Sequence, residues 1–290
     1  MREFILATET NCDMPQDFIE KHGILVIPHY YTVEEKQYGI GYEELTIKEF
    51  YDEMRAGKKV GTMASNPAVI EEKFTEVAKS GKDILFVSFS SELSGGYSNI
   101  CMGAKMIMEE YPDMTIEVVD TKSASACEGM LLQKAAELRA EGKSITETAE
   151  ELRNIVPRLS FIFTVDDLDY LFRGGRLSKS SAIIGNMINL KPILYVTEEG
   201  KLSPLTKVRG SKKAIATMLD SVEERIGQYK DKQIFMGVVH GDNEEAAKDL
   251  AAKITERFGI TNIMILPIGP SIGAHSGPGT LGIGFMGEKR

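Results

Sequence analysis

The feature of this 290-residue sequence that most constrains its fold is the alternation of short apolar runs with helical segments. Four runs in the first half are rich in β-branched and aromatic residues, as expected of buried strands: 3–8, 24–27, 83–88 and 115–119. Helix signals lie between and after them. Thr46 and Glu49 form a capping box, and Asn66 stands as a cap before Pro67. Further helices are expected over 94–110 and 122–141, and after the Ser144 capping box up to Pro157. This alternation predicts a parallel sheet covered by helices.

The pattern changes after Pro157. Residues 160–165 have the composition of a strand, and KPILYVTEEGKLSPLTKVR predicts an antiparallel hairpin that turns at Glu198-Glu199-Gly200. Later strands and helices alternate again, with strands at 233–239 and 262–266 and helices near 211–228 and 243–258. The chain is longer than one core usually holds, so two domains are expected. They are an N-terminal parallel-sheet, Rossmann-like α/β domain over 1–158 and a C-terminal mixed-sheet α/β domain over 159–290.

The charge of the chain limits its partners. A net charge of −9 argues against binding nucleic acid or anionic lipid by bulk attraction. Residues 173–213 nevertheless hold nine Lys or Arg and two acids, so that this segment is +7 and the remainder −16. Such a segment meets an acidic partner or a phosphate, or is simply a solvated charged face. No apolar run approaches the roughly 18 residues of a membrane span, and the first residues do not resemble a signal peptide. A cytoplasmic protein is expected.

Neither a metal nor a cofactor is predicted. Cys12, Cys101 and Cys127 lie far apart, without a C-x-x-C pair or a histidine at ligand spacing. This arrangement argues against a disulfide framework and against a zinc site, and it predicts three reduced thiols. Acidic residues and histidines do not cluster at ligand spacing elsewhere either.

The segment PIGPSIGAHSGPGTLGIGF, residues 267–285, matches two catalytic patterns, G-x-S-x-G around Ser271 and G-x-G-x-x-G from Gly277. A nucleophile elbow needs a helix directly after its serine, and Pro270 and the glycines after Ser271 are not expected to form one. A dinucleotide fingerprint needs a helix, a strand and an acid about 20 residues further on, but only eight residues follow it. Neither activity is predicted from these patterns. His275, within the glycines, is either an anion ligand or a structural residue.

A second stretch, SFSSELSGGYSN at 88–99, follows the strand at 83–88. Ser94-Gly95-Gly96 opens the next helix, which places free backbone N–H groups and a hydroxyl at a positive helix end. Open α/β sheets bind ligands at this edge. Thr62 and Ser65, just before another helix, can join the same anion. Helix capping is an alternative explanation for all three hydroxyls.

Eight stretches, in order and over nearly the whole chain, resemble the DegV family of bacterial fatty-acid-binding proteins: ATETNCDMP, TMASNP, SSELSGGY, VVDTKSAS, LDYLFRGGR, NLKPIL, KVRGSKKA and IGAHSGPGTLG. The resemblance implies a two-domain α/β protein that encloses one long-chain fatty acid. It implies that the carboxylate is bound by Thr62, Ser94 with Gly95, and His275. Additional contacts are expected from Ser65, Gly96, Gly273 and Ala274. Such neutral donors hold a carboxylate less tightly than a bidentate arginine would, so the acid stays available for transfer.

The resemblance also implies a protein partner. Some members of the family present the bound acid to a separate fatty acid kinase, which phosphorylates the carboxylate to an acyl phosphate. The chain itself is then not an enzyme. Arg173, Arg176 and Arg209 fall in YLFRGGR and KVRGSKKA, and they are expected to dock the kinase or to face its nucleotide.

The chain departs from the family pattern at two places. It has Glu9-Thr10 where the family commonly has Asp-Ser, and Gly96 where threonine commonly follows L-S-G, so one hydroxyl near the carboxylate is missing. Two other functions stay open. One is a Ser–His acyl hydrolase or transferase that uses Ser94 or Ser271 with His275. The other is a carrier that binds a different anionic lipid and has no partner kinase. In that case Arg209 has no role in docking. The sequence leaves chain length, saturation and oligomeric state open.

Overall fold

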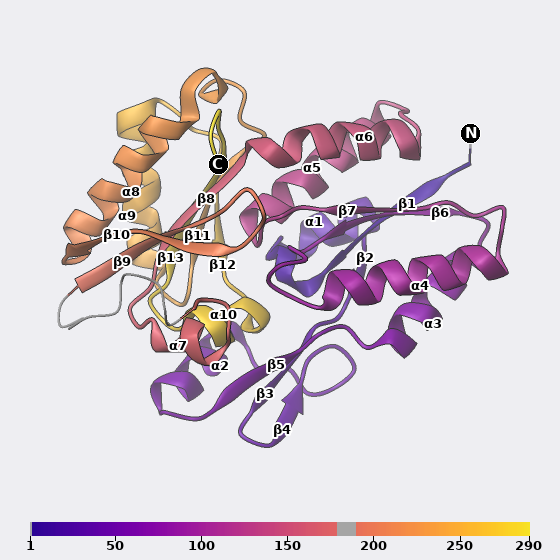
Figure 1. Ribbon diagram of the computed structural model, residues 1–290, viewed down its shortest axis with the longest axis horizontal. Helices are drawn as coiled ribbons and strands as arrows, with labels where there is room; N and C mark the ends of the chain where they lie inside the picture. Colours follow the sequence, from indigo (N-terminus) through magenta and orange to yellow (C-terminus); the bar gives the residue numbers. More distant parts are fainter. Residues whose placement is uncertain (1, 179–189) are drawn as a thin grey trace.

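The computed structural model describes residues 2–178 and 190–290, and these residues form three sheets (Figure 1). The first sheet is parallel, with the strand order β2-β1-β6-β7. Its strands are β1 (Phe4–Glu9), β2 (Leu25–Ile27), β6 (Asp83–Ser88) and β7 (Ile116–Asp120). Every residue of β6 is buried, as expected for a strand with both faces covered. The predicted parallel, helix-covered sheet is confirmed.

Helices cover both faces of the parallel sheet. Successive side chains of a strand point to opposite faces, and the apolar clusters follow this rule. Ile84 and Phe86 pack with helices α3 (Pro67–Lys79) and α4 (Gly96–Glu110) on one face. Leu85 and Val87 pack on the other face, with helices α5 (Ala126–Ala140) and α6 (Ile145–Ile155). The short helix α1 (Gln16–His22) contributes Ile19 to this second cluster.

The second sheet is mixed and has the strand order β10-β9-β8-β13-β11-β12. Its strands are β8 (Leu159–Thr164), β9 (Leu190–Val196), β10 (Leu202–Arg209), β11 (Met236–His240), β12 (Ile263–Pro267) and β13 (Leu281–Met286). Strands β9 and β10 form the antiparallel hairpin that the sequence predicts. Helices α8 (Ser211–Ile226) and α9 (Glu244–Phe258) pack on one face of the sheet. A mixed α/β arrangement of this portion is confirmed.

Helix α5 lies between the two large sheets. It contacts β1 and β6 of the parallel sheet and β11 and β13 of the mixed sheet, and ten of its residues are buried. A helix with apolar residues on all sides is expected in such a position. The approach to the mixed sheet depends on glycine, because a Cβ atom at Gly237 would lie 2.2 Å from the Cβ of Ala126. The largest apolar cluster therefore runs from Phe4 to Met286 through both portions, and a domain division at residue 158 stays a prediction.

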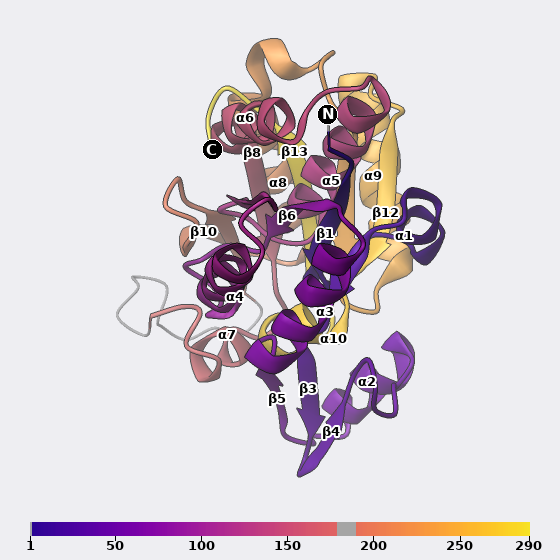
Figure 2. The ribbon, with the colours of Figure 1, turned by 90° about the vertical axis from the view of Figure 1, so that its right-hand side faces the viewer.

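A third, antiparallel sheet of order β4-β3-β5 was not predicted from the sequence. Its strands are β3 (Tyr30–Val33), β4 (Lys36–Tyr38) and β5 (Val60–Met63), and they are too short to give a periodic signal. Helix α2 (Ile47–Arg55) packs on the sheet through Phe50 and Tyr51. Figure 2 shows this sheet and α2 at one end of the molecule, with α10 (Pro270–Ser276) beside them.

The helix signals in the sequence correspond to actual caps. Thr46 and Ser144 form complete capping boxes, and the side chain of Asn66 accepts a hydrogen bond from the backbone N–H of Ala68. The remaining helical elements are α7 (Asp169–Arg173) and three 3₁₀ segments, Thr10–Cys12, Val156–Arg158 and Gly227–Tyr229. Within the described part of the chain, no helix is long and apolar enough to cross a membrane. Cys12, Cys101 and Cys127 form no disulfide with one another.

The expectation that no helix surrounds Ser271 is wrong. Helix α10 begins at Pro270, because proline is favoured at the first helical position, where its missing N–H is not needed. Gly273 lets the helix pack closely, since a Cβ atom there would lie 2.5 Å from the Tyr51 hydroxyl oxygen. The helix ends at Ser276, and the following residue, Gly277, has a φ of +81° that favours glycine. The strand–turn–helix context of Ser271 therefore exists, in a helix of only seven residues.

Candidate functional site

A cavity lies where the parallel sheet ends against the mixed sheet and α10. Its apolar lining comes from the mixed sheet, α7, α10 and the segments after β6, before α5 and after β12: Phe89, Leu93, Ala124, Phe161, Phe163, Leu171, Val196, Leu202, Ile268 and Ile272. Ten of the 22 lining residues have polar side chains, so the cavity combines apolar surface with groups that can bind the polar end of an apolar ligand.

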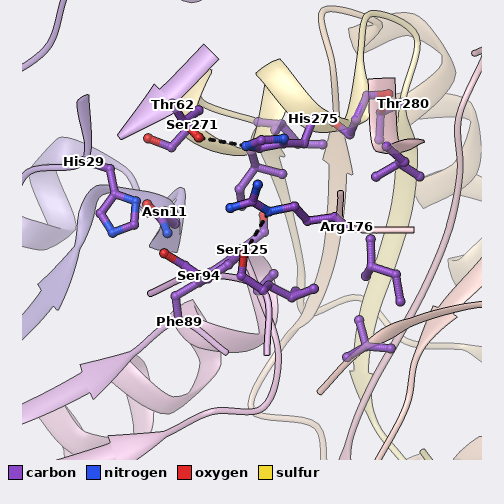
Figure 3. A pocket seen from close by; sticks show the side chains of 18 of the residues that line it. Asn11, His29, Thr62, Phe89, Ser94, Ser125, Arg176, Ser271, His275 and Thr280 are labelled. Carbon is purple, nitrogen blue, oxygen red and sulfur yellow. Dashed lines mark hydrogen bonds between the residues drawn. The ribbon is translucent and has the colours of Figure 1, made fainter. Parts of the chain in front are cut away.

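Two of the predicted ligand residues meet in the cavity wall. Thr62, near the end of β5, and His275, on α10, are 213 residues apart in sequence, yet the Oγ1 of Thr62 lies 2.7 Å from the Nε2 of His275 (Figure 3). Strand β5 of the third sheet thus places Thr62 next to His275. If Nε2 donates to Thr62, the hydroxyl proton of Thr62 stays available for an anion in the cavity.

The environment of His275 keeps its imidazole neutral. Burial, with the positive charge of Arg176 as a second cause, lowers the pKa of His275 from 6.5 to about 4. The Nδ1 atom is buried and has no hydrogen-bond partner in the described part of the chain. Gly174 packs against this ring, because a Cβ atom at position 174 would lie 2.1 Å from Nδ1. At neutral pH, His275 therefore contributes hydrogen bonding and no charge.

Ser94 and Gly95 line the same cavity at the beginning of α4. The Oγ of Ser94 accepts a hydrogen bond from the backbone N–H of Gly96, over 3.1 Å. This hydrogen bond and a ligand role of Ser94 are compatible, since Oγ acts here as the acceptor and its proton stays available. The amino end of this 15-residue helix adds a favourable dipole for an anion.

Arg176 lies in the cavity lining, a position that the sequence did not predict. Its guanidinium donates to the backbone oxygens of Leu93, over 2.9 Å, and Gly174, over 2.5 Å. Burial lowers the pKa of Arg176, but an arginine stays charged in a protein. The cavity therefore contains a fixed positive charge, whereas the sequence analysis expected neutral donors alone. A role of Arg176 in docking stays a prediction.

The two departures from the family pattern explain each other. The carboxylate of Glu9 is fully buried, and it accepts hydrogen bonds from Ser88 Oγ and from the backbone N–H of Phe89, each over 2.9 Å. A Cβ atom at Gly96 would lie 2.4 Å from Glu9 Oε1. The longer acid thus occupies the space that a side chain at position 96 would need.

Glu9 also orients a residue that the sequence analysis missed. Its Oε1 lies 2.7 Å from the Nε2 of His29, and His29 lines the cavity together with Asn11. Figure 3 shows both on the side of the cavity away from Thr280. No sequence motif points to His29, because its neighbours become apparent only when β1, β3 and α4 are assembled.

The other predicted residues lie outside the cavity lining. Ser65 is buried and its hydroxyl has no partner among the described residues, while Gly96 and Gly273 pack behind the wall. Ala274 faces a neighbouring groove, described below. Arg173 and Arg209 are exposed. Residues 179–189, part of the predicted basic segment, lie outside the described residues.

The Ser–His hypothesis gains no support from the hydrogen bonds at His275. Ser271 and Ser94 line the cavity, but Nε2 of His275 lies against Thr62 and no carboxylate bonds to Nδ1 in the described residues. A catalytic histidine usually has a hydrogen-bonded serine and an orienting acid. Groups of His, Cys, Asp and Glu that could hold a metal ion are also absent from residues 2–178 and 190–290.

Comparison with known proteins agrees with this architecture. The DegV family model, described as a family of uncharacterised proteins, matches residues 4–288. The chain therefore belongs to the DegV family. It is 36% identical over 287 residues to a DegV domain-containing protein of Streptococcus pyogenes serotype M3, with 99% of each chain covered. It is 33% identical over 289 residues to one of Caldanaerobacter subterraneus subsp. tengcongensis, with both chains fully covered.

Solved structures with the same fold carry descriptions of lipid binding. The DegV of Bacillus subtilis, described as a fatty acid binding protein, aligns with a TM-score of 0.86 and 27% identity, covering 99% of this chain and 100% of that one. A DegV lipid binding protein of Thermotoga maritima aligns with a TM-score of 0.85 and 27% identity, covering 99% of each chain. The family and the fold expected from the sequence are confirmed.

Proposed function

We propose that this protein binds one long-chain fatty acid in the cavity and presents its carboxylate to a partner kinase. The observation that carries the proposal is the Thr62–His275 pair, whose 2.7 Å contact stands in the wall of a mostly apolar cavity. Hydroxyl and imidazole groups at the edge of such a cavity suit the carboxylate of a fatty acid. The descriptions of the Bacillus subtilis and Thermotoga maritima relatives support the same ligand class.

The head group is bound by Thr62, Ser94 with Gly95, and His275. The hydroxyl groups of Thr62 and Ser94 donate hydrogen bonds to the carboxylate, and the dipole of α4 stabilises its negative charge. The Arg176 guanidinium in the cavity lining attracts the same charge. Ser65, Gly96, Gly273 and Ala274 support these residues from behind, and direct contact with the ligand is not required of them. The acyl chain packs against the apolar lining, which provides about 0.8 kcal/mol for each buried methylene.

The kinase part of the proposal rests on the exposed basic residues. Arg173 and Arg209 are exposed on a chain whose net charge is −9, so they offer positive charge to an acidic or nucleotide-bearing surface. Such residues act mainly on the rate of association with the partner. The chain itself then binds and positions, and the partner supplies the phosphoryl group.

Native mass spectrometry of the purified protein, followed by extraction of its ligand, tests the binding step. We expect one fatty acid per chain, and less of it in Ser94→Ala and His275→Ala. Matched controls are Ser80→Ala, an exposed serine at the end of α3, and His22→Ala at the end of α1. Unchanged lipid in both site variants contradicts the assigned residues. A different anionic lipid supports the carrier alternative, and cleavage of acyl esters by an empty protein supports the hydrolase alternative.

A coupled assay tests the presentation step. Arg209→Ala is expected to retain the fatty acid but to slow acyl phosphate formation with a fatty acid kinase. Lys248→Ala is the matched control, since Lys248 is an exposed cation on α9. Normal turnover by the Arg209 variant contradicts its role in docking.

A further inference from the structure

A second concave surface lies outside the Thr62–His275 pair. We call it the outer groove, and it is formed where β5 and the segment before it face α7 and α10. It shares Thr62, Arg176 and His275 with the fatty acid cavity. The cavity and the outer groove therefore lie next to each other at these three residues. A group attached to a carboxylate that is bound by Thr62 and His275 therefore lies close to this groove.

The outer groove is basic. Its eleven lining residues include Lys58, Lys59, Arg173 and Arg176, and they include no Asp or Glu. Lys58 forms an ion pair with Glu53. Lys59 and Arg173, by contrast, form no ion pair with the described residues, and the Arg173 guanidinium lies over the Tyr170 ring at 4.8 Å.

This concentration of positive charge is unusual for the molecule, because the whole chain carries a net charge of −9. A concave surface lined by one sign of charge raises the local concentration of ions of the opposite sign. In the proposed function, the carboxylate of the fatty acid is already bound by Thr62, Ser94 and His275. The outer groove therefore fits a second, more highly charged anion that lies next to the carboxylate.

We propose that the outer groove binds the phosphoryl group of an acyl phosphate, with Lys59 as a direct ligand. The inference rests on the proposed function, since the acyl chain must occupy the cavity. In the reaction, a carboxylate oxygen forms a bond to the γ-phosphorus of a nucleoside triphosphate held by the partner. The bond between that phosphorus and its bridging oxygen breaks, and the nucleoside diphosphate leaves with the electron pair. The phosphoryl group, now on the acid, lies against the cations of the groove.

Lys59 suits this role because its side chain is not needed elsewhere. Its backbone N–H donates to Glu34 Oε1 over 2.8 Å, and its backbone oxygen accepts from the N–H of Glu34 over 2.7 Å. These contacts hold the main chain and leave the ammonium group without a partner in the described residues. Replacing the side chain by glutamine therefore removes the charge and preserves the loop.

A non-hydrolysable probe tests the proposal without the kinase. In a long-chain 2-oxoalkylphosphonate, a methylene replaces the bridging oxygen of an acyl phosphate. Its Kd is measured by calorimetry on delipidated protein and compared with that of the fatty acid of the same chain length. Lys59→Gln and the double variant Lys58→Gln/Lys59→Gln are compared with Lys248→Gln, a charge-matched control on α9.

The wild-type protein is expected to bind the phosphonate more tightly than the fatty acid. Lys59→Gln raises the Kd of the phosphonate about threefold to fivefold at low salt, as for an exposed ion pair, and leaves the Kd of the fatty acid unchanged. Added salt reduces this difference. Lys248→Gln changes neither Kd.

Equal phosphonate affinities in the wild type and both groove variants, with normal fatty acid binding, would overturn the phosphoryl site alone. An equal loss of affinity for both ligands in the groove variants would also overturn it, because it would indicate a structural effect. Failure of the wild type to bind either ligand would overturn the proposed function together with the groove assignment.

Discussion

The close approach of Gly96 to Glu9 predicts a specific effect of adding one methyl group. In Gly96→Ala, the new Cβ would lie 2.4 Å from Glu9 Oε1 and 3.0 Å from His29 Nε2. Real Cβ contacts are longer than the first of these distances, so the carboxylate must move. It cannot do so freely, because it is fully buried and accepts hydrogen bonds from Ser88 and Phe89.

The size of the effect follows from the contacts that are lost. Moving Oε1 breaks the 2.7 Å contact with His29, and a hydrogen bond to a charged group contributes about 1.5–3 kcal/mol. Alanine stabilises a helix by up to about 1 kcal/mol relative to glycine, which offsets part of this loss. Gly96→Ala should therefore lower the free energy of unfolding by about 0.5–2 kcal/mol. The assay is urea unfolding of the ligand-free protein, followed by circular dichroism.

The neighbouring glycine provides the control. A Cβ atom at Gly95 would have no heavy atom within 4 Å, so Gly95→Ala should change the free energy of unfolding by less than about 0.5 kcal/mol. Glu9→Asp withdraws the carboxylate by one methylene, and the double variant should be more stable than the two single effects predict, by about 1 kcal/mol. The reasoning is refuted if Gly96→Ala costs no more than Gly95→Ala, or if the effects at positions 9 and 96 simply add.

Three further predictions concern the head-group residues. Gly174→Ala places a Cβ 2.1 Å from His275 Nδ1 and should displace the ring, which weakens fatty acid binding about tenfold in calorimetry; an unchanged Kd contradicts this. Arg176→Met should weaken binding of a fatty acid about tenfold but not that of the matching alcohol, and equal losses for both ligands would indicate a packing effect. His275, with a pKa of about 4 in the folded chain against 6.5 ordinarily, stays neutral while the unfolded chain takes up a proton. The free energy of unfolding should therefore fall by about 1.4 kcal/mol per unit as pH decreases from 6.5 to 4. The same slope in His275→Asn would assign the pH dependence to other groups.

Sequence reasoning succeeded where the signal is local. The buried strand 83–88 has a continuous apolar run, and the Thr46 and Ser144 caps have their glutamate three residues later. These features depend on neighbours in the chain, so they could be predicted from the sequence. Thr62 and His275 were linked to one ligand by family resemblance, and the 2.7 Å contact between them is a property of the assembled fold.

The features that were missed depend on distant contacts. Strands β3 and β4 have four and three residues, and their pairing with β5 is held by Tyr31 and the aromatic residues of α2. The sequence around Arg176 favours a surface residue, whereas in the fold its guanidinium donates to the backbone oxygens of Leu93 and Gly174. In the sequence, Glu9 and Gly96 are two separate departures from the family pattern. In the fold they are neighbours, and the Glu9 carboxylate occupies the space that a side chain at position 96 would need.

The position of α5 determines how the chain can be divided. Its buried side chains face β1 and β6 on one side and β11 and β13 on the other. A fragment that ended at residue 158 would keep α5 but expose to water the surface that Phe161, Phe235 and Val239 now cover. Such a fragment is expected to aggregate when it is produced alone and to recover solubility when residues 159–290 are co-expressed with it. The first half of the chain therefore reaches its stable packing only when strands β11 and β13 of the second half are present.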